Sequence, residues 1–198
     1  MVISSATPAE ALERLKAGNA RFMAGTPQHE RYGPRVSEFA GDQEPFAVVL
    51  ACSDSRLPVE TLFDQLPGEI FVVRVAGNFL SDDTLGSIEF GVGVLKAKLI
   101  VVLGHSQCGA VKAALAYVRD GVEQPGHVQQ IVEKVAPAVL AARGFPGDWL
   151  EIGTIQNVAL NVQAVTKNSE IIAARVNAGE VKVIGGIYNV HTGWVAFA

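Results

Sequence analysis

Residues 46–56 read FAVVLACSDSR, a short apolar run that reaches a cysteine and then two charged side chains. A second stretch, residues 99–109, has the same plan and reads LIVVLGHSQCG. Both runs are rich in β-branched residues and bounded by polar residues or glycine, which is typical of buried parallel strands. Each stretch therefore predicts one strand of a parallel sheet, with chemically reactive side chains just beyond it.

The two stretches contain the chain's only cysteines, together with further polar side chains: Cys52, Cys108, Asp54, Arg56 and His105. If the chain stays extended after Cys52, then Cys52, Asp54 and Arg56 share one side, because alternate residues of an extended chain face the same way. His105 is expected at the end of its strand. Cys108 is expected in the first turn of the next helix, where backbone N–H groups favour a thiolate.

Both half-motifs lie where open α/β sheets gather their sites, beyond the carboxyl ends of neighbouring strands. Two sulfurs, one imidazole nitrogen and one carboxylate oxygen make a tetrahedral and partly soft ligand set, which suits Zn²⁺. Each half-motif alone has a plainer explanation, a buried cysteine beside a surface ion pair or a core cysteine beside a helix-capping histidine. The coincidence of the two, each after its own strand, predicts a zinc site.

The sequence resembles the β-class carbonic anhydrases from its N-terminal helix to its last strand. CSDSR and GHSQCG match the two zinc half-motifs of that family, and FDQLPGEIFVVRVAGN and LGSIEFGVGVL match its pattern between them. The resemblance implies that Cys52, His105 and Cys108 are zinc ligands. Asp54 is then either a fourth ligand or the partner of Arg56.

The resemblance also implies a reaction, the reversible hydration of CO₂ to bicarbonate and a proton, with Asp54 and Arg56 as catalytic residues. Zinc with three protein ligands and an open position lowers the pKa of water and so supplies the hydroxide that attacks CO₂. Asp54 on zinc would exclude water, whereas Asp54 paired with Arg56, a bidentate donor, leaves room for it. Two thiolates donate more negative charge than two imidazoles would, so activity is expected to favour alkaline pH.

The family resemblance assigns three residues to the substrate side. Gln43 supplies an amide that orients substrate or bicarbonate, and Phe71 and Phe90 line an apolar pocket. Phe90 belongs to the pocket of its own chain or to that of a neighbouring subunit. A core position for both phenylalanines is the alternative. Many plant-type relatives carry Tyr in place of Phe90, so any role of that hydroxyl is absent here.

Other positions narrow the subtype but add no catalytic residue. A second subtype of the family has Trp in a non-catalytic bicarbonate site where this chain has Val49, so the plant-like type I is favoured. The remaining histidines stand in polar, helix-start or turn settings: His29, His127 and His191. No direct role is predicted for them, although a proton relay stays open.

Three alternative functions stay open on the sequence. A relative acting on COS or CS₂ would use the same site chemistry. A zinc-binding protein without turnover would keep Asp54 on the metal, but a purely structural site with four ligands has no need of Arg56. A thiol enzyme would use Cys108 as nucleophile and His105 as base.

Composition limits the class of protein. The net charge of −4 provides no basic surface for nucleic acid, and no apolar run is long enough to span a membrane. The start of the chain lacks the charged-then-apolar pattern of a signal peptide, so we expect a cytoplasmic protein. In a reducing compartment, two cysteines favour metal binding over a disulfide.

With 198 residues the chain is predicted to form one domain, residues 1–198. Residues 1–45 are expected to form a helix and a wrapping loop, and residues 46–198 an α/β core that binds zinc. The 49% hydrophobic content suits a large buried sheet and a buried subunit interface. We therefore expect a homodimer or a dimer of dimers. The first helix is expected to pack on a partner, with packing on its own core as the alternative.

The predicted fold class is α/β, a mostly parallel central sheet of four strands with helices on its flanks and an antiparallel edge strand at the C-terminus. Strands are expected at residues 46–51, 69–75, 99–103, 181–188 and 194–197. Helices are expected at residues 8–24, 58–63, 81–95, 109–121, 127–143 and 153–177. Thr7 and Glu10 predict a capping box for the first helix. Pro137 is expected to kink or interrupt the fifth.

Overall fold

The computed structural model describes residues 6–28 and 37–198. Its sheet has five strands in the order β2-β1-β3-β4-β5. The strands are β1 (Ala47–Ala51), β2 (Ile70–Arg74), β3 (Leu99–His105), β4 (Lys182–Tyr188) and β5 (Val195–Phe197). The first four pair in parallel and β5 pairs antiparallel to β4. The predicted α/β fold class is confirmed, and the prediction for His29 lies outside the described residues.

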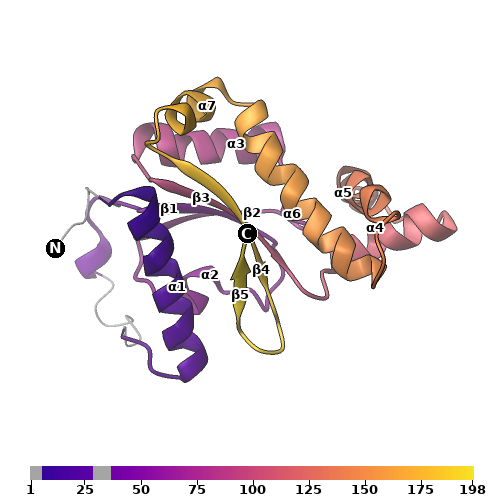
Figure 1. Ribbon diagram of the computed structural model, residues 1–198, viewed down its shortest axis with the longest axis horizontal. Coiled ribbons are helices and arrows are strands. Elements are labelled where there is room, and N and C mark those ends of the chain that lie inside the picture. The colour runs from indigo at the N-terminus through magenta and orange to yellow at the C-terminus, as the bar shows by residue number, and fades with distance from the viewer. Residues whose placement is uncertain (1–5, 29–36) are drawn as a thin grey trace.

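The helices alternate with the parallel strands along the chain (Figure 1). They are α1 (Pro8–Ala24), α2 (Val59–Leu62), α3 (Asp82–Glu89), the π-helix η2 (Phe90–Val94), α4 (Gly109–Asp120), α5 (Val128–Ala142), α6 (Trp149–Lys167) and α7 (Glu170–Asn177). Within the described residues, no helix is both long and apolar enough to cross a membrane.

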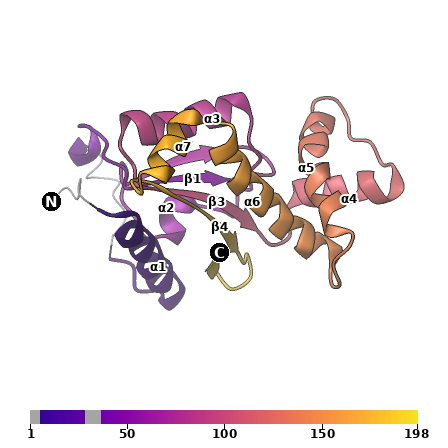
Figure 2. The ribbon, with the colours of Figure 1, turned by 45° about the horizontal axis from the view of Figure 1, so that its top comes forward.

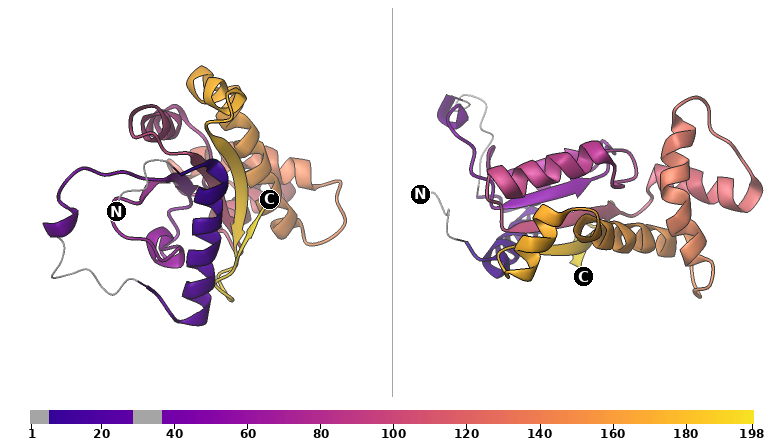
Figure 3. Two further views of the ribbon diagram at one scale, coloured as in Figure 1. Left: turned by 60° about the vertical axis from the view of Figure 1, so that its left-hand side comes forward. Right: turned by 90° about the horizontal axis from the view of Figure 1, so that it is seen from above.

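The helices form two layers around the sheet. Helices α1 and α2 cover one face, and α3, η2, α6 and α7 cover the other (Figure 2). Helices α4 and α5 lie beyond the end of the sheet, where they pack on each other and on the first half of α6 (Figure 3). The carboxyl ends of β1 and β3 therefore face the α4–α5 pair.

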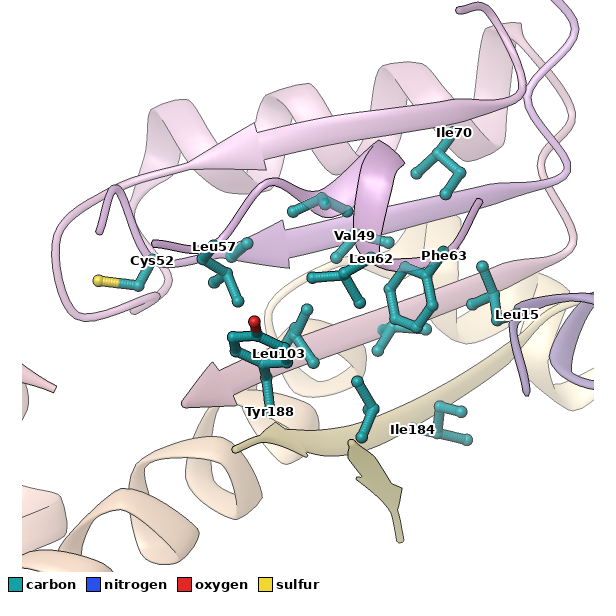
Figure 4. Close-up of a cluster of buried hydrophobic side chains, with 14 of the residues drawn as sticks. Leu15, Val49, Cys52, Leu57, Leu62, Phe63, Ile70, Leu103, Ile184 and Tyr188 are labelled. Carbon is teal, nitrogen blue, oxygen red and sulfur yellow. The ribbon is translucent and has the colours of Figure 1, made fainter. Parts of the chain in front are cut away.

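Alternation along the strands explains the two buried clusters. In β1, Val49 points into the cluster under α1 and α2, while Val48 points to the opposite face. The first cluster surrounds Phe63 and Leu15, which are fully buried (Figure 4). Cys52 lies at the edge of this cluster, at the carboxyl end of β1 (Figure 4).

Helix α1 packs on its own chain. Thr7 and Glu10 form the predicted capping box at its start. Asn19, which is buried, donates hydrogen bonds to the carbonyls of Leu62 and Gly193 and accepts one from the Val195 amide. The helix is therefore attached to both α2 and the C-terminal hairpin of the same chain. Additional packing on a partner stays a prediction.

Two predicted helices differ from the structure. The single helix expected over residues 153–177 is two helices, because the Ser169 hydroxyl accepts a hydrogen bond from Ile172 N–H and starts α7. The first of them begins earlier than expected, because Asp148 caps it through the Glu151 amide. Pro137 lies inside α5, which runs through it, so the predicted interruption is wrong.

Gly91 allows a close approach between η2 and the sheet. A Cβ at Gly91 would lie 2.5 Å from Val48 Cγ2, so η2 packs against β1 more closely than any larger residue allows. A Cβ at Gly86 would meet nothing within 4 Å, and one at Gly93 would meet only Ile171 at 3.8 Å. Of these three glycines, Gly91 is therefore the one that close packing within this chain requires.

Candidate metal centre

The sheet register brings the two half-motifs together. Strands β1 and β3 are neighbours, with Ala51 opposite Leu103, so Cys52 follows one strand beside the point where His105 ends the other. Cys108 is the N-cap residue of α4, one position before the first turn in which it was predicted. The ligand atoms of Cys52, His105 and Cys108 lie within 4.8 Å of one another, and all three residues are buried.

The ring of His105 is oriented for a metal. Its Nδ1 lies 3.0 Å from the Ser106 carbonyl oxygen. Because a carbonyl only accepts, Nδ1 carries the proton and Nε2 keeps its lone pair. Nε2 is buried and has no hydrogen-bond partner among the described residues. A buried polar atom without a partner lowers the stability of the fold, so the structure favours a ligand between this nitrogen and the two sulfurs.

The two cysteine side chains affect each other's ionisation. Their mutual contact lowers the pKa of Cys52 to about 4, and the same contact, together with burial, raises the pKa of Cys108. The Gly77 N–H donates a hydrogen bond to the Cys52 sulfur, at 3.3 Å. Two thiolates this close repel each other unless a cation lies between them. A divalent metal would stabilise both as thiolates, so the residues present fit zinc.

The chain turns at Ser55 and Arg56. The Leu57 N–H donates to the Asp54 carbonyl at 3.0 Å, so the expectation of an extended run from Cys52 to Arg56 is wrong. Asp54 and Arg56 nevertheless meet. Arg56 donates Nε to Asp54 Oδ1 at 2.9 Å and Nη2 to Oδ2 at 2.7 Å, and its backbone N–H also donates to Oδ1.

This pairing decides where the Asp54 carboxylate points. Its hydrogen bonds with Arg56 hold the pKa of Asp54 well below its usual range, so the carboxylate stays charged. Asp54 Oδ2 lies 3.9 Å from His105 Nε2, but the carboxylate is not part of the group formed by the two sulfurs and the imidazole. In this structure Asp54 therefore lies at the edge of the site as the partner of Arg56.

Arg74 is a residue of the site that the sequence reasoning missed. It ends β2, and its guanidinium donates hydrogen bonds to the carbonyl oxygens of Cys52 and Asp54. Arg74 stands at the carboxyl end of a strand, the edge where such sites form, but its contacts are with main-chain carbonyls, which have no signature in the sequence.

The structure does not bring the predicted substrate residues to this group. Gln43 is exposed and precedes β1, beside Gly68, so it lies at the opposite end of the strand from Cys52. Phe71 is opposite Val48 in the register, on the other face of the sheet from the metal cluster. The rings of Phe71 and Phe90 are 6.0 Å apart, and Phe90 is 45% exposed.

Comparisons with known proteins show which family the sequence resembles. A family model described as carbonic anhydrase matches residues 47–195. The chain is 41% identical over 187 residues to carbonic anhydrase 2 of Mycobacterium tuberculosis, covering 94% of this chain and 90% of that protein. It is 42% identical over 192 residues to a carbonic anhydrase of Mycolicibacterium smegmatis, covering 96% and 93%.

Solved structures resemble the fold as well. A β-carbonic anhydrase of Coccomyxa, in complex with acetazolamide, has a TM-score of 0.69 at 30% identity, covering 96% of this chain and 84% of that one. A tetrameric β-carbonic anhydrase of the ascomycete Sordaria macrospora has a TM-score of 0.71 at 27% identity, covering 83% and 86%.

Proposed function

The chain belongs to the carbonic anhydrase family, in its β class, and we propose that it hydrates CO₂ reversibly at a zinc ion held by Cys52, His105 and Cys108. The observation that carries the proposal is the buried group of two sulfurs and one unpartnered nitrogen within 4.8 Å. When bound, zinc would supply a Lewis acid that lowers the pKa of water and makes hydroxide available near neutral pH.

Asp54 and Arg56 orient the nucleophile in this proposal. Both carboxylate oxygens accept hydrogen bonds from the Arg56 side chain, which keeps the charge of Asp54 satisfied away from the metal ligands. An oxygen of Asp54 then has lone pairs left to accept a hydrogen bond from the attacking water or hydroxide. Fixing the direction of that O–H bond aims the oxygen lone pair at the carbon of CO₂.

The substrate side of the proposal needs a second copy of the chain. CO₂ is small, apolar and uncharged, and Phe71 and Phe90 offer an apolar, half-open surface. Gln43 and Val94 line one open groove of about 900 Å³ at the amino end of the sheet. We propose that these residues complete the site of a partner subunit in a homodimer or a dimer of dimers. The exposed edge of Phe90 would then be covered.

Two further predictions accompany the function as proposals. The division into an N-terminal arm of residues 1–45 and a zinc-binding core of residues 46–198 stays a prediction, and so does the cytoplasmic location. The absence of Trp at Val49, which is buried in the core under α2, favours the type I subtype.

The test is the metal content of the purified protein together with stopped-flow CO₂ hydration across pH. We expect about one zinc per chain, the stoichiometry of a site with three protein ligands and one open position, and hydration that rises with pH. Zinc without hydration at any pH would favour a binding protein, and hydrolysis of COS or CS₂ without CO₂ hydration would favour that activity. Alkylation of Cys108 at equal rates with and without metal would favour a thiol enzyme.

A further inference from the structure

We propose that Arg74 is the positioning residue that holds the Cys52–Asp54 segment in the arrangement the reaction needs. This inference rests on the proposed function, because it assigns Arg74 a role in keeping Asp54 directed at Arg56. Arg74 touches neither the ligand atoms nor the Asp54 carboxylate in any hydrogen bond that the structure shows, so its effect acts through the main chain.

The contacts of Arg74 span the segment. Its Nε and Nη2 donate to the Cys52 carbonyl oxygen at 3.1 and 2.9 Å, and Nη2 also donates to the Asp54 carbonyl oxygen at 2.7 Å. One guanidinium thus joins the carbonyl of the first metal-site cysteine to that of the catalytic carboxylate. Because the donors lie in a rigid plane, the guanidinium fixes the separation of the two carbonyls as well as their direction.

Backbone hydrogen bonds also hold the segment. The Ser53 N–H donates to the Val75 carbonyl at 3.3 Å, and the Val75 N–H donates to the Ala51 carbonyl at 3.2 Å. These bonds continue the pairing of β1 and β2 past the ends of both strands. They do not depend on the side chain at position 74, so the fold is expected to survive its replacement.

The orientation of the Asp54 peptide matters because its side chain has two destinations. The carbonyl and the carboxylate are attached to the same Cα, so a shift of the main chain at that atom also moves the carboxylate. Asp54 Oδ2 is 3.9 Å from His105 Nε2, within a small movement of the position that a fourth metal ligand would occupy. Arg56 holds the side chain away from that position, and Arg74 holds the backbone that carries it.

A role in general stability makes different predictions. If Arg74 only stabilised the fold, its replacement would lower the unfolding temperature and would not single out residues 53–57. A positioning role predicts a local change at those residues, a fall in kcat without a change in KM for CO₂, and partial rescue by lysine. Lysine keeps the charge and can reach one carbonyl, but it lacks the planar fork that reaches two.

The experiment compares Arg74→Ala and Arg74→Lys with the unmodified protein and with Arg119→Ala. Arg119 is a matched control, because it is an exposed arginine paired with Asp120 on α4. Three quantities are measured: amide hydrogen exchange of residues 53–57 in the zinc-loaded protein, the visible spectrum of the cobalt-substituted protein, and kcat and KM for CO₂ hydration.

For Arg74→Ala we expect faster exchange confined to residues 53–57, a changed cobalt spectrum as Asp54 joins the metal, and a kcat lower by about tenfold or more, equivalent to about 1.4 kcal/mol of barrier. Arg74→Lys should fall between, and Arg119→Ala should match the unmodified protein. Unchanged exchange and spectrum, a faster-exchanging loop with unchanged kcat, or equal losses in both variants with a lower unfolding temperature would each overturn the proposal.

The outcome is distinguishable from a failure of the proposed function. If the unmodified zinc-loaded protein hydrates no CO₂, the proposed function fails by itself. Hydrogen exchange and the cobalt spectrum still report whether Arg74 holds the segment, because neither depends on turnover.

Discussion

The two ends of the parallel sheet differ in how much of a site one chain can complete. At the carboxyl end, Cys52, His105 and Cys108 are buried and lie within 4.8 Å of one another. At the amino end, Gln43 is exposed in an open groove, and Phe90 keeps 45% of its surface exposed. Both sets are implied by the same family resemblance, yet only one is brought together by the fold of a single chain.

The difference follows from topology. Parallel neighbours place their carboxyl ends at one edge, so two half-motifs that are far apart in the sequence meet as soon as β1 pairs with β3. Gln43 precedes β1, and Phe90 begins η2, which leads back towards the start of β3. These residues therefore lie at the other end of the sheet, where we propose that a second molecule completes the substrate site. One chain is expected to bind zinc, and two chains to turn over CO₂.

The largest expected effect is loss of the metal. His105→Ala and Cys52→Ser each remove one donor from the buried group, so both should lose most of the zinc and nearly all CO₂ hydration. His127→Ala is the matched control, because His127 is exposed at the start of α5 and should keep both. Zinc analysis after dialysis against a weak chelator reads the outcome. Full zinc retention in both variants would rule out the site.

Removing the cation beside Asp54 should spare the metal and stop the reaction. In Arg56→Ala the carboxylate loses both side-chain hydrogen bonds, so it is expected to turn to zinc and exclude water. Zinc should stay near one per chain while hydration falls by orders of magnitude, about 1.4 kcal/mol for each tenfold loss. Arg56→Lys should recover part of the rate. Wild-type rates in Arg56→Ala would mean that the Asp54–Arg56 pair is only a surface feature.

Asp54→Asn separates the two roles of the carboxylate. The amide cannot replace the charge on zinc or the full set of acceptors, so an open metal with reduced hydration and a weaker pH dependence is expected.

Mixing two inactive variants tests the amino end directly. Gln43→Ala keeps its metal site, and Cys108→Ser keeps Gln43. If Gln43 acts on the site of the partner, a mixed dimer contains one intact site. An equal mixture refolded together should reach about a quarter of the unmodified rate, because random pairing in a two-fold dimer makes half of the dimers mixed. A rate equal to the mean of the two parents would place Gln43 in its own chain or outside the reaction.

The smallest effect concerns packing below the substrate surface. A Cβ at Gly91 would lie 2.5 Å from Val48 and 3.3 Å from the Phe71 ring, so Gly91→Ala should shift Phe71 and cost about 1–3 kcal/mol of unfolding free energy. Gly86→Ala is the matched control in α3, where a Cβ meets nothing. It should gain about 0.5–1 kcal/mol from helix propensity. Urea unfolding compares the two, and equal stabilities would contradict the close packing of η2.

Local chemistry carried most of the fold prediction. The capping box of Thr7 and Glu10 placed the start of α1, and the two apolar runs placed β1 and β3. The break at Ser169 was not predicted, because Ile172 continues the apolar period of α6. In the structure the Ser169 hydroxyl accepts a hydrogen bond from the Ile172 N–H and donates one to Glu89. A side chain can continue a pattern and still start a new helix.

The metal group could be predicted from the sequence, whereas the role of Arg74 could not. Cysteine and histidine are typical metal ligands, and their positions after two strands predict that they lie close together, as the structure shows. Arg74 acts through the carbonyls of Cys52 and Asp54, and backbone acceptors have no signature in the sequence. Gln43 and Phe90 were assigned from the resemblance alone, and the fold of one chain does not bring them to the metal group.

The proposed zinc-dependent hydration is tested most directly by the CO₂ hydration rate of metal-free protein titrated with zinc. We expect no hydration without metal, a rate that rises in proportion to added zinc, and a plateau at about one zinc per chain, as for a single site with three protein ligands. Hydration that persists in the metal-free protein, or no hydration at full occupancy, would contradict it.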